Sequence, residues 1–129
     1  MTLVRGFLLA AGGFSVVVGV GYMVRPVELA ALADLTLPSP KAVIEVQGFY
    51  GGQLVGMGVA MLIAAFNPRL VVPGLLLVAA PLAGTAVGRL YGGLANGAFP
   101  AAIAALMILE AAIAAVAMVM LRREMSHAA

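Results

Sequence analysis

Four long apolar stretches divide the chain, and each is long enough to cross a bilayer as one helix. A transmembrane helix needs about 20 mainly apolar residues to cover a hydrocarbon core of ~30 Å. The stretches cover residues 3–24, 42–66, 70–90 and 101–121. Because a helix satisfies its backbone hydrogen bonds internally, lipid tolerates it. The pattern therefore predicts an all-α fold, an integral membrane four-helix bundle formed by a single transmembrane domain over residues 1–129.

Polar and helix-breaking residues separate these stretches and predict the connections. After Arg25-Pro26, apolar residues at positions 27, 29, 31, 32 and 35 indicate a short half-amphipathic segment at the membrane interface. Ser39 and Pro40 suit the N-cap and first position of the next helix. Asn67-Pro68-Arg69 leaves room only for a tight antiparallel hairpin, and the glycine-rich residues 91–100 form the last link.

Composition excludes the usual soluble classes. The chain is 64% apolar and 9% charged, whereas soluble domains are about 45–50% apolar and about 25% charged. We therefore expect contact with a lipid bilayer and no nucleic-acid partner. Cysteine is absent, and the one histidine, His127, follows the last stretch. Neither a metal site nor a cofactor is expected from these residues.

The basic residues predict an orientation. The first stretch is read as a retained span, because its apolar run is longer than that of a typical signal peptide. Four spans place both termini on one side. That side carries Arg5, Arg69, Arg122 and Arg123, against Arg25, Lys41 and Arg89 on the other side. The balance predicts a multi-pass protein of the cell inner membrane with cytoplasmic termini.

Several polar residues lie inside the apolar stretches. At ~1.5 Å of helical rise per residue, Glu110 lies about 16 Å from the terminal side, near the midplane. A charge there costs about 2.5–3.5 kcal/mol on insertion scales, so it usually faces the bundle interior and a partner. One polar column from the far interface to the middle is expected, made of Glu45, Tyr50, Gln53, Thr85, Arg89 and Glu110.

The Arg89 side chain has two possible arrangements. Its long stem can reach down to Glu110 and leave a paired, ionised carboxylate. Otherwise it turns to the interface, and Glu110 is protonated and donates a hydrogen bond. A structural pair and a ligand or catalytic role both remain open for these two residues. Glu45, Gln53 and Thr85 are expected to line a polar core or to bind a ligand.

Small residues and prolines predict how the helices pack. Gly48, Gly52 and Gly56, here called the glycine stripe, recur every four residues and allow two backbones to approach closely. Packing within the chain is favoured over a homodimer seam. Pro73 and Pro81 are expected to bend the third stretch and free backbone carbonyls, which either widens a cavity or only shapes the packing.

The order of these features resembles a known family. Glu45-x-x-x-x-Tyr50-Gly51-Gly52, followed by Gly88-Arg89 and Glu110, is similar to the bacterial membrane proteins grouped as domain of unknown function 4345. The likeness covers nearly the whole chain. It implies four spans in a layout similar to the DoxX-like group and points to Glu45, Tyr50, Arg89 and Glu110. It implies no substrate. Gln47 departs from the pattern, which favours a basic residue there.

These features are compatible with two functions of different class. The favoured one is a helix bundle that binds a lipid-like ligand (a lipid, quinone or isoprenoid) or docks in a membrane complex, as a homo-oligomer or with another membrane protein. The lack of any nucleophile or cofactor motif supports it. The alternative is a small intramembrane isomerase or hydrolase of an apolar substrate. There Glu110 would be the proton donor or acceptor, oriented by Arg89 and Tyr50.

Overall fold

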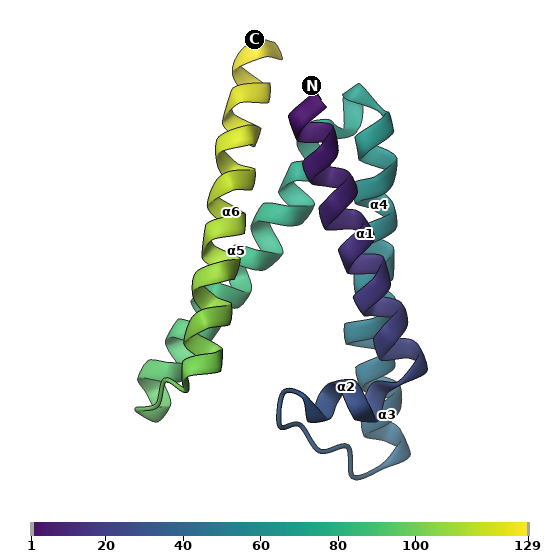
Figure 1. The fold of residues 1–129 in the computed structure, drawn as a ribbon, viewed down its shortest axis with the longest axis vertical. Helices are drawn as coiled ribbons and strands as arrows, with labels where there is room; N and C mark the ends of the chain where they lie inside the picture. The colour runs from purple at the N-terminus through teal and green to yellow at the C-terminus, as the bar shows by residue number, and fades with distance from the viewer. Residues whose placement is uncertain (1, 129) are drawn as a thin grey trace. The chain divides into compact units, whose positions relative to one another are not determined.

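The computed structural model describes the backbone of residues 2–128 and the side chains of residues 3–126, and this part is mostly helical, without strands (Figure 1). In chain order the elements are α1 (Thr2–Val24), α2 (Pro26–Ala31), α3 (Pro40–Val46), the π-helix η1 (Gln47–Gly52), α4 (Gln53–Phe66), the 3₁₀ turn η2 (Pro68–Leu70), α5 (Val71–Asn96) and α6 (Ala101–Ala128). Four continuous helical segments are long and apolar enough to cross a membrane. The predicted all-α membrane fold is confirmed.

The chain divides into two compact units, Met1–Asn67 and Pro68–Ala129. In the first unit α1 packs along α4, and in the second α5 packs along α6. Each unit is thus a helical hairpin with its own interhelical contact. The grouping of both into a single transmembrane domain stays a prediction.

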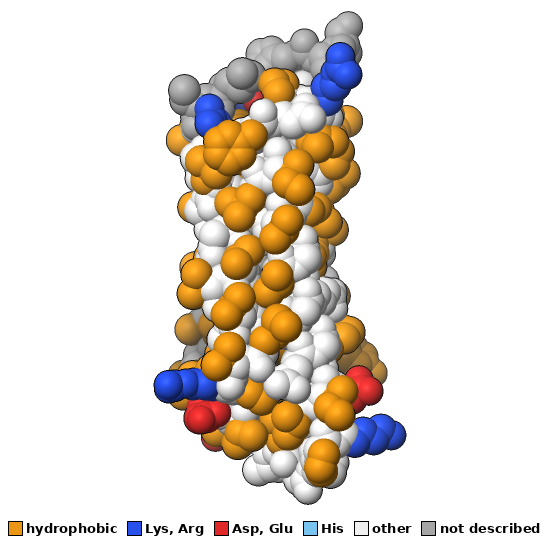
Figure 2. Space-filling view, turned by 90° about the vertical axis from the view of Figure 1, so that its right-hand side faces the viewer, with side chains coloured by type: hydrophobic (Ala, Val, Ile, Leu, Met, Phe, Trp, Pro, Cys, Tyr) orange, Lys and Arg blue, Asp and Glu red, His pale blue; other side chains and the backbone are white. Residues whose placement is uncertain are grey.

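Apolar side chains cover the outside of the first hairpin. Figure 2 shows a face on which charged side chains gather near the two ends, with a broad apolar band between them. Large side chains along α1, among them Phe14, Val17 and Val20, are exposed. Such a surface is unfavourable in water and suits contact with lipid. At one end of the hairpin, the Arg5 guanidinium lies 4.6 Å from the centre of the Phe66 ring, a cation–π contact that joins α1 to α4.

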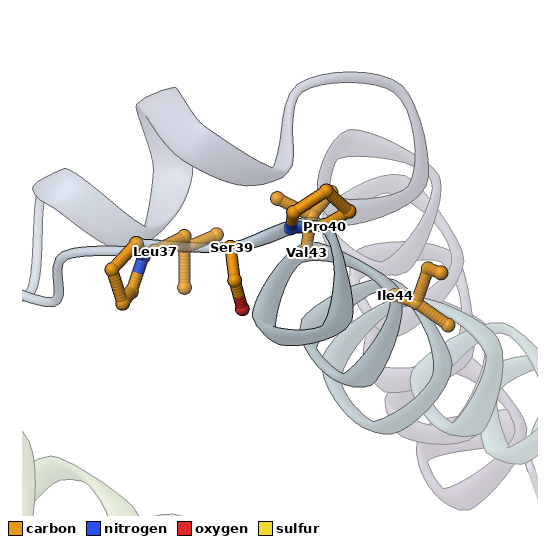
Figure 3. A pocket seen from close by; sticks show the side chains of 6 residues that line it. Leu37, Ser39, Pro40, Val43 and Ile44 are labelled. Atoms are coloured by element: carbon orange, nitrogen blue, oxygen red, sulfur yellow. The ribbon is translucent and has the colours of Figure 1, made fainter.

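The connection between α1 and α4 follows the predicted signals. α2 is the short segment expected near the interface, and the Ala42 N–H donates to the Ser39 hydroxyl oxygen at 3.3 Å, as the N-cap predicted. Pro40 is the first residue of α3. A shallow, open hollow lies along this connection (Figure 3), lined by Leu37, Pro38, Ser39, Pro40, Val43 and Ile44. Because it is open, it encloses no site.

The third span is longer than expected. α5 continues through residues 91–96, which were assigned to the glycine-rich link, so that part of the prediction is wrong. The helix ends where Gly97 takes a left-handed conformation with φ +62°. The Ala98 N–H then donates to the Gly93 carbonyl at 3.0 Å, as in a Schellman motif. Glycines inside a helix weaken it but do not end it, whereas a left-handed residue does.

Four glycines set the contact between α1 and the second span. A methyl group on Gly12 would lie 2.8 Å from the Gly58 carbonyl oxygen, and one on Gly19 would lie 2.8 Å from the Gly51 carbonyl oxygen. The two positions are seven residues apart on each segment, which gives an antiparallel register. The backbones therefore approach too closely for any side chain at these points.

The expected role of the glycine stripe is corrected within this hairpin. A methyl group on Gly48 or Gly56 would meet nothing within 4 Å, and one on Gly52 would be nearest to a carbonyl of its own segment. Gly56 and the contact glycine Gly58 lie two residues apart in the regular helix α4, so they face nearly opposite sides of it. The stripe therefore lies on another face of the segment than the contact with α1. As a homodimer seam, the stripe stays a prediction.

Candidate functional site

An ion pair joins α5 to α6. The Arg89 Nη1 nitrogen contacts the Glu110 Oε2 oxygen, and both atoms are buried. Among the described residues, neither atom has another hydrogen-bonding partner. Of the two arrangements open to Arg89, the structure therefore shows the paired one.

Both side chains of the pair are largely buried, which makes the loss of one partner costly. The Arg89 side chain is 31% exposed and that of Glu110 is 16% exposed, so both are largely withdrawn from the surface. The removal of one partner from a buried pair leaves an uncompensated charge, which costs about 3–5 kcal/mol. The pair therefore joins α5 to α6, and a structural role and a ligand or catalytic role both stay predictions.

An open apolar groove of about 320 Å³ lies on α5 and α6, within one helical turn of the ion pair along each helix. It is lined by Ala79, Ala83, Ala86, Val87, Ala111, Ala114, Ala115 and Met118. Ala86 lies three residues before Arg89 and Ala114 lies four residues after Glu110, so the lining and the pair share the same helix faces. None of the side chains in the lining is polar.

The groove has a direction. α5 and α6 run antiparallel (Figure 1), so its lining extends from the pair toward the start of α5 and the end of α6. On α6 it spans Ala111 to Met118, about 10 Å at ~1.5 Å per residue. Ala79 and Ala83 flank Pro81, the proline inside α5. Pro73 lies in the first turn of α5, where a proline costs little. The groove lies beside Pro81, which does not line it, and the effect of the prolines on a cavity stays a prediction.

The other predicted polar residues have separate surroundings. Thr85 donates its hydroxyl to the Leu82 carbonyl of its own helix at 3.1 Å. Tyr50 belongs to an aromatic cluster of the first unit, with its ring centre 5.4 Å from that of Tyr22 and 5.8 Å from that of Phe49. Glu45 and Gln53 are exposed in that unit. The polar column and the orientation of Glu110 by Tyr50 stay predictions.

The described part of the chain holds no group of three or more His, Cys, Asp or Glu residues that could bind a metal ion. The His127 side chain lies outside the described residues.

The family model for domain of unknown function 4345 (DUF4345) matches residues 3–121, nearly the whole chain. The chain belongs to this family. No curated protein and no solved structure matches it. The matched range includes both members of the ion pair and the entire groove lining, so the candidate site lies within the DUF4345 domain.

Sequence reasoning missed the role of Gln47 in this DUF4345 protein. Its side-chain amide donates to the Met23 carbonyl at 2.9 Å. That carbonyl lies in the last turn of α1, where carbonyls lack the usual partner four residues on. Gln47 thus caps the end of α1 from η1. The sequence contains a signal for this cap. Pro26 lies two residues after the end of α1 and has no backbone N–H, so the hydrogen bonds of α1 cannot continue past it.

We expect Gln47→Leu to lower the free energy of unfolding by about 0.5–1.5 kcal/mol, because the Met23 carbonyl loses its donor. Equilibrium unfolding in mixed detergent micelles, followed by helicity, measures this loss. Gln53→Leu is the matched control, because the structure records no hydrogen bond of the Gln53 side chain among the described residues. Equal losses in both variants would contradict the capping role.

Proposed function

We propose that this protein is a non-enzymatic membrane protein that holds a lipid-like molecule on its α5–α6 hairpin. The observation that carries the proposal is a fully apolar groove that begins beside a largely buried ion pair. We also propose a bacterial inner-membrane location with cytoplasmic termini; the arginine balance of the sequence supports this orientation.

The size and lining of the groove support a hydrocarbon chain as the occupant. A volume of about 320 Å³ lies at the low end of the range for small-molecule sites, about 300–1,000 Å³. Alanine supplies six of the eight lining residues, so the walls are smooth and close to the helix backbones. A slender chain fits such a groove better than a ring system or a charged group.

The same groove supports binding more than catalysis. General acid–base catalysis needs a group within hydrogen-bonding reach of the substrate. The lining offers no polar side chain, and the buried Glu110 oxygen is already engaged by Arg89. The geometry therefore favours a bound chain over a substrate that is protonated or deprotonated by Glu110. Docking of a partner helix in the groove is the competing form of binding.

We expect Ala115→Phe to remove a co-purified lipid-like ligand. Ala115 lines the groove and is exposed, so the ring would fill the groove without entering the interface between the helices. Over-packing costs about 1–3 kcal/mol, which corresponds to a loss of occupancy of about tenfold. Native mass spectrometry of the gently extracted protein, followed by lipid analysis, measures this occupancy.

Ala112→Phe is the matched control. Ala112 is an exposed alanine of the same helix but does not line the groove. A ligand that stays bound to the control and leaves Ala115→Phe supports the proposal. A wild-type protein without a stoichiometric ligand, or one that carries another protein chain at this groove, would overturn it.

A further inference from the structure

Two levels of charge bound the apolar surface of the first hairpin (Figure 2). On α1, residues 6–24 carry no charge, and Arg5 and Arg25 flank them. These residues extend about 28 Å at ~1.5 Å per residue, which matches a hydrocarbon core of ~30 Å. One boundary of the membrane therefore lies at the level of Arg25, where α1 has just ended.

The contact between the helices carries this level to the second span. Gly19 faces the Gly51 carbonyl in an antiparallel pair. Arg25 lies six residues after Gly19, and Glu45 lies six residues before Gly51. Arg25 and Glu45 are therefore at about the same level. The start of α3, including Lys41, lies beyond the hydrocarbon.

Two further contacts agree with this boundary. The hydrogen bond from the Gln47 amide to the Met23 carbonyl joins positions two residues inside it on each helix. The ring centres of Tyr22 and Tyr50 lie 5.4 Å apart, close to the same level. Tyrosine is enriched at membrane–water interfaces, where its ring meets lipid and its hydroxyl meets water. Charge, register and aromatic side chains thus place the end of α1 at an interface.

α2 is held at this level because it folds back against α1. A methyl group on Gly21 would lie 3.2 Å from the Leu29 Cδ2 atom, so the Leu29 side chain reaches a level inside the boundary. Pro26 and Ala30, on one side of α2, are buried, and α2 also contacts α3. Figure 1 shows α2 running across the end of the hairpin rather than along its axis. α2 therefore lies close to the plane of the interface.

Backbone hydrogen bonds fix the turn that follows α2. Asp34 takes a left-handed conformation with φ 56°, which aspartate tolerates better than most residues. The Asp34 N–H donates to the Ala31 carbonyl at 3.1 Å, and the Leu35 N–H donates to the Ala30 carbonyl at 3.0 Å, as in a Schellman motif. Residues 26–35, here called the α2 elbow, therefore form one ordered unit.

The α2 elbow exposes large apolar side chains at the level of the interface. Leu32 is 87% exposed, Val27 is 52% exposed and Leu35 is 46% exposed. Val24, the last residue of α1, is exposed too, so the lipid-facing surface of α1 continues onto the elbow. Such side chains are unfavourable in water, whereas the boundary between lipid headgroups and acyl chains accommodates them.

The charges of this region do not favour anionic lipids. Anionic lipids attract polybasic segments. Residues 25–46 hold two basic residues and three acidic ones, which gives a net charge of −1: Arg25 and Lys41 against Glu28, Asp34 and Glu45. The attraction between this region and a membrane must therefore come from its apolar side chains.

We propose that the α2 elbow is an interfacial anchor whose partner is the lipid bilayer itself. Val27, Leu32 and Leu35 insert to a depth of about 5–10 Å at the boundary between headgroups and acyl chains. Their insertion does not depend on the charge of the lipid. This contact holds the end of the first hairpin at the membrane surface, and it is separate from ligand binding by the α5–α6 groove.

Spin labels on single cysteines test the anchor in the full-length protein, in phosphatidylcholine vesicles. The chain has no cysteine, so each label has one position. Val27→Cys, Leu32→Cys and Leu35→Cys replace exposed side chains, so the labels displace no packed residue. Collisions with oxygen, which concentrates in hydrocarbon, and with a nickel chelate, which stays in water, give the depth of each label. We expect a depth of about 5–10 Å at all three positions.

Two exposed positions supply the matched controls. Val17→Cys lies on the lipid-facing surface of α1, and Lys41→Cys lies beyond the boundary. We expect the elbow labels to collide with the nickel chelate less often than the Lys41→Cys label and more often than the Val17→Cys label. The addition of phosphatidylglycerol to the vesicles should leave the depth of the elbow labels unchanged.

Three results would overturn the proposal. Nickel collisions at the elbow as frequent as at Lys41→Cys would place the elbow in water. Elbow labels shielded from both oxygen and nickel would show that protein covers the elbow instead of lipid. An elbow that reaches this depth only when phosphatidylglycerol is present would show attraction by charge and not by apolar insertion.

Discussion

The replacement of Glu110 by glutamine is expected to destabilise the protein by about 3–5 kcal/mol, whereas the removal of both charges should cost far less. In Glu110→Gln the Arg89 charge stays in a membrane-spanning helix without its counter-charge. An unpaired buried charge carries a penalty of that size. Insertion scales give a similar value, about 2.5–3.5 kcal/mol for one arginine at the centre of a span.

The double variant Arg89→Met with Glu110→Met tests the cause. When apolar residues of similar volume replace a buried pair, the change is often neutral or stabilising. We therefore expect it to recover most of the stability that Glu110→Gln loses. Together with the single variants Arg89→Met and Glu110→Met, this double variant forms a double-mutant cycle that gives the coupling energy of the two residues. Equilibrium unfolding in mixed micelles provides the four free energies.

A control variant on α6, the helix of Glu110, tests whether the loss of any charge lowers stability. Arg122 is exposed near the end of α6, so Arg122→Met is expected to change stability by less than about 0.5 kcal/mol. If the double variant were as unstable as Glu110→Gln, the ion pair would not be the source of the loss. The Glu110 carboxylate would then have a second role, such as the acid–base chemistry that the groove does not favour.

The positions of the spans could be predicted because hydrophobicity alone determines them. Proline and serine signals also placed the start of α3 correctly, since capping is a local property of the backbone. The end of α5 could not be predicted in the same way. Glycines at 92, 93 and 97 are equivalent by composition, and only the left-handed conformation of Gly97 distinguishes the one that ends the helix.

The sequence left the arrangement of Arg89 open, and it raised a cavity at the prolines without identifying the alanines of α5 and α6 as its lining. Whether Arg89 reaches Glu110 depends on how far α5 and α6 are displaced along each other's axes. The short link from Gly97 to Pro100 sets this displacement. The groove depends on the same offset, because alanines on two helices form a hollow only where they face each other. The alanines of α5 and α6 recur every three or four residues, a signal that could have indicated a shared smooth face.

The glycine stripe shows why spacing within one helix does not identify a contact. Recurrence every four residues assumes one continuous α-helix from residue 42 to residue 66. The π-helix η1 interrupts it. Even within the regular helix α4, the stripe residue Gly56 and the contact glycine Gly58 face nearly opposite sides, and spacing does not tell which side meets α1. The glycines that do contact α1 recur every seven residues, and sequence analysis gave that spacing no weight.

A pair of alanine substitutions two residues apart should therefore have opposite effects. In Gly58→Ala the new methyl group would lie 2.7 Å from the Gly12 carbonyl oxygen and 2.9 Å from the Val16 backbone nitrogen. Backbone atoms of a packed helix cannot move aside cheaply, so α1 and α4 must separate. We expect a loss of about 1–3 kcal/mol, the usual cost of over-packing. The other three contact glycines are expected to behave similarly, with Gly51 the least sensitive, because its nearest neighbour is the flexible Met23 side chain.

Gly56→Ala is the matched control on the same helix. A methyl group there meets nothing within 4 Å, and alanine is favoured over glycine inside a helix by up to ~1 kcal/mol. We expect this variant to be as stable as the wild type or more stable, in the same mixed-micelle unfolding measurement. Because both variants make the same chemical change, their difference isolates the contact with α1. A loss of stability in Gly56→Ala as large as in Gly58→Ala would show that the glycine stripe also packs against a neighbour, and it would restore the homodimer seam as the first interface to test.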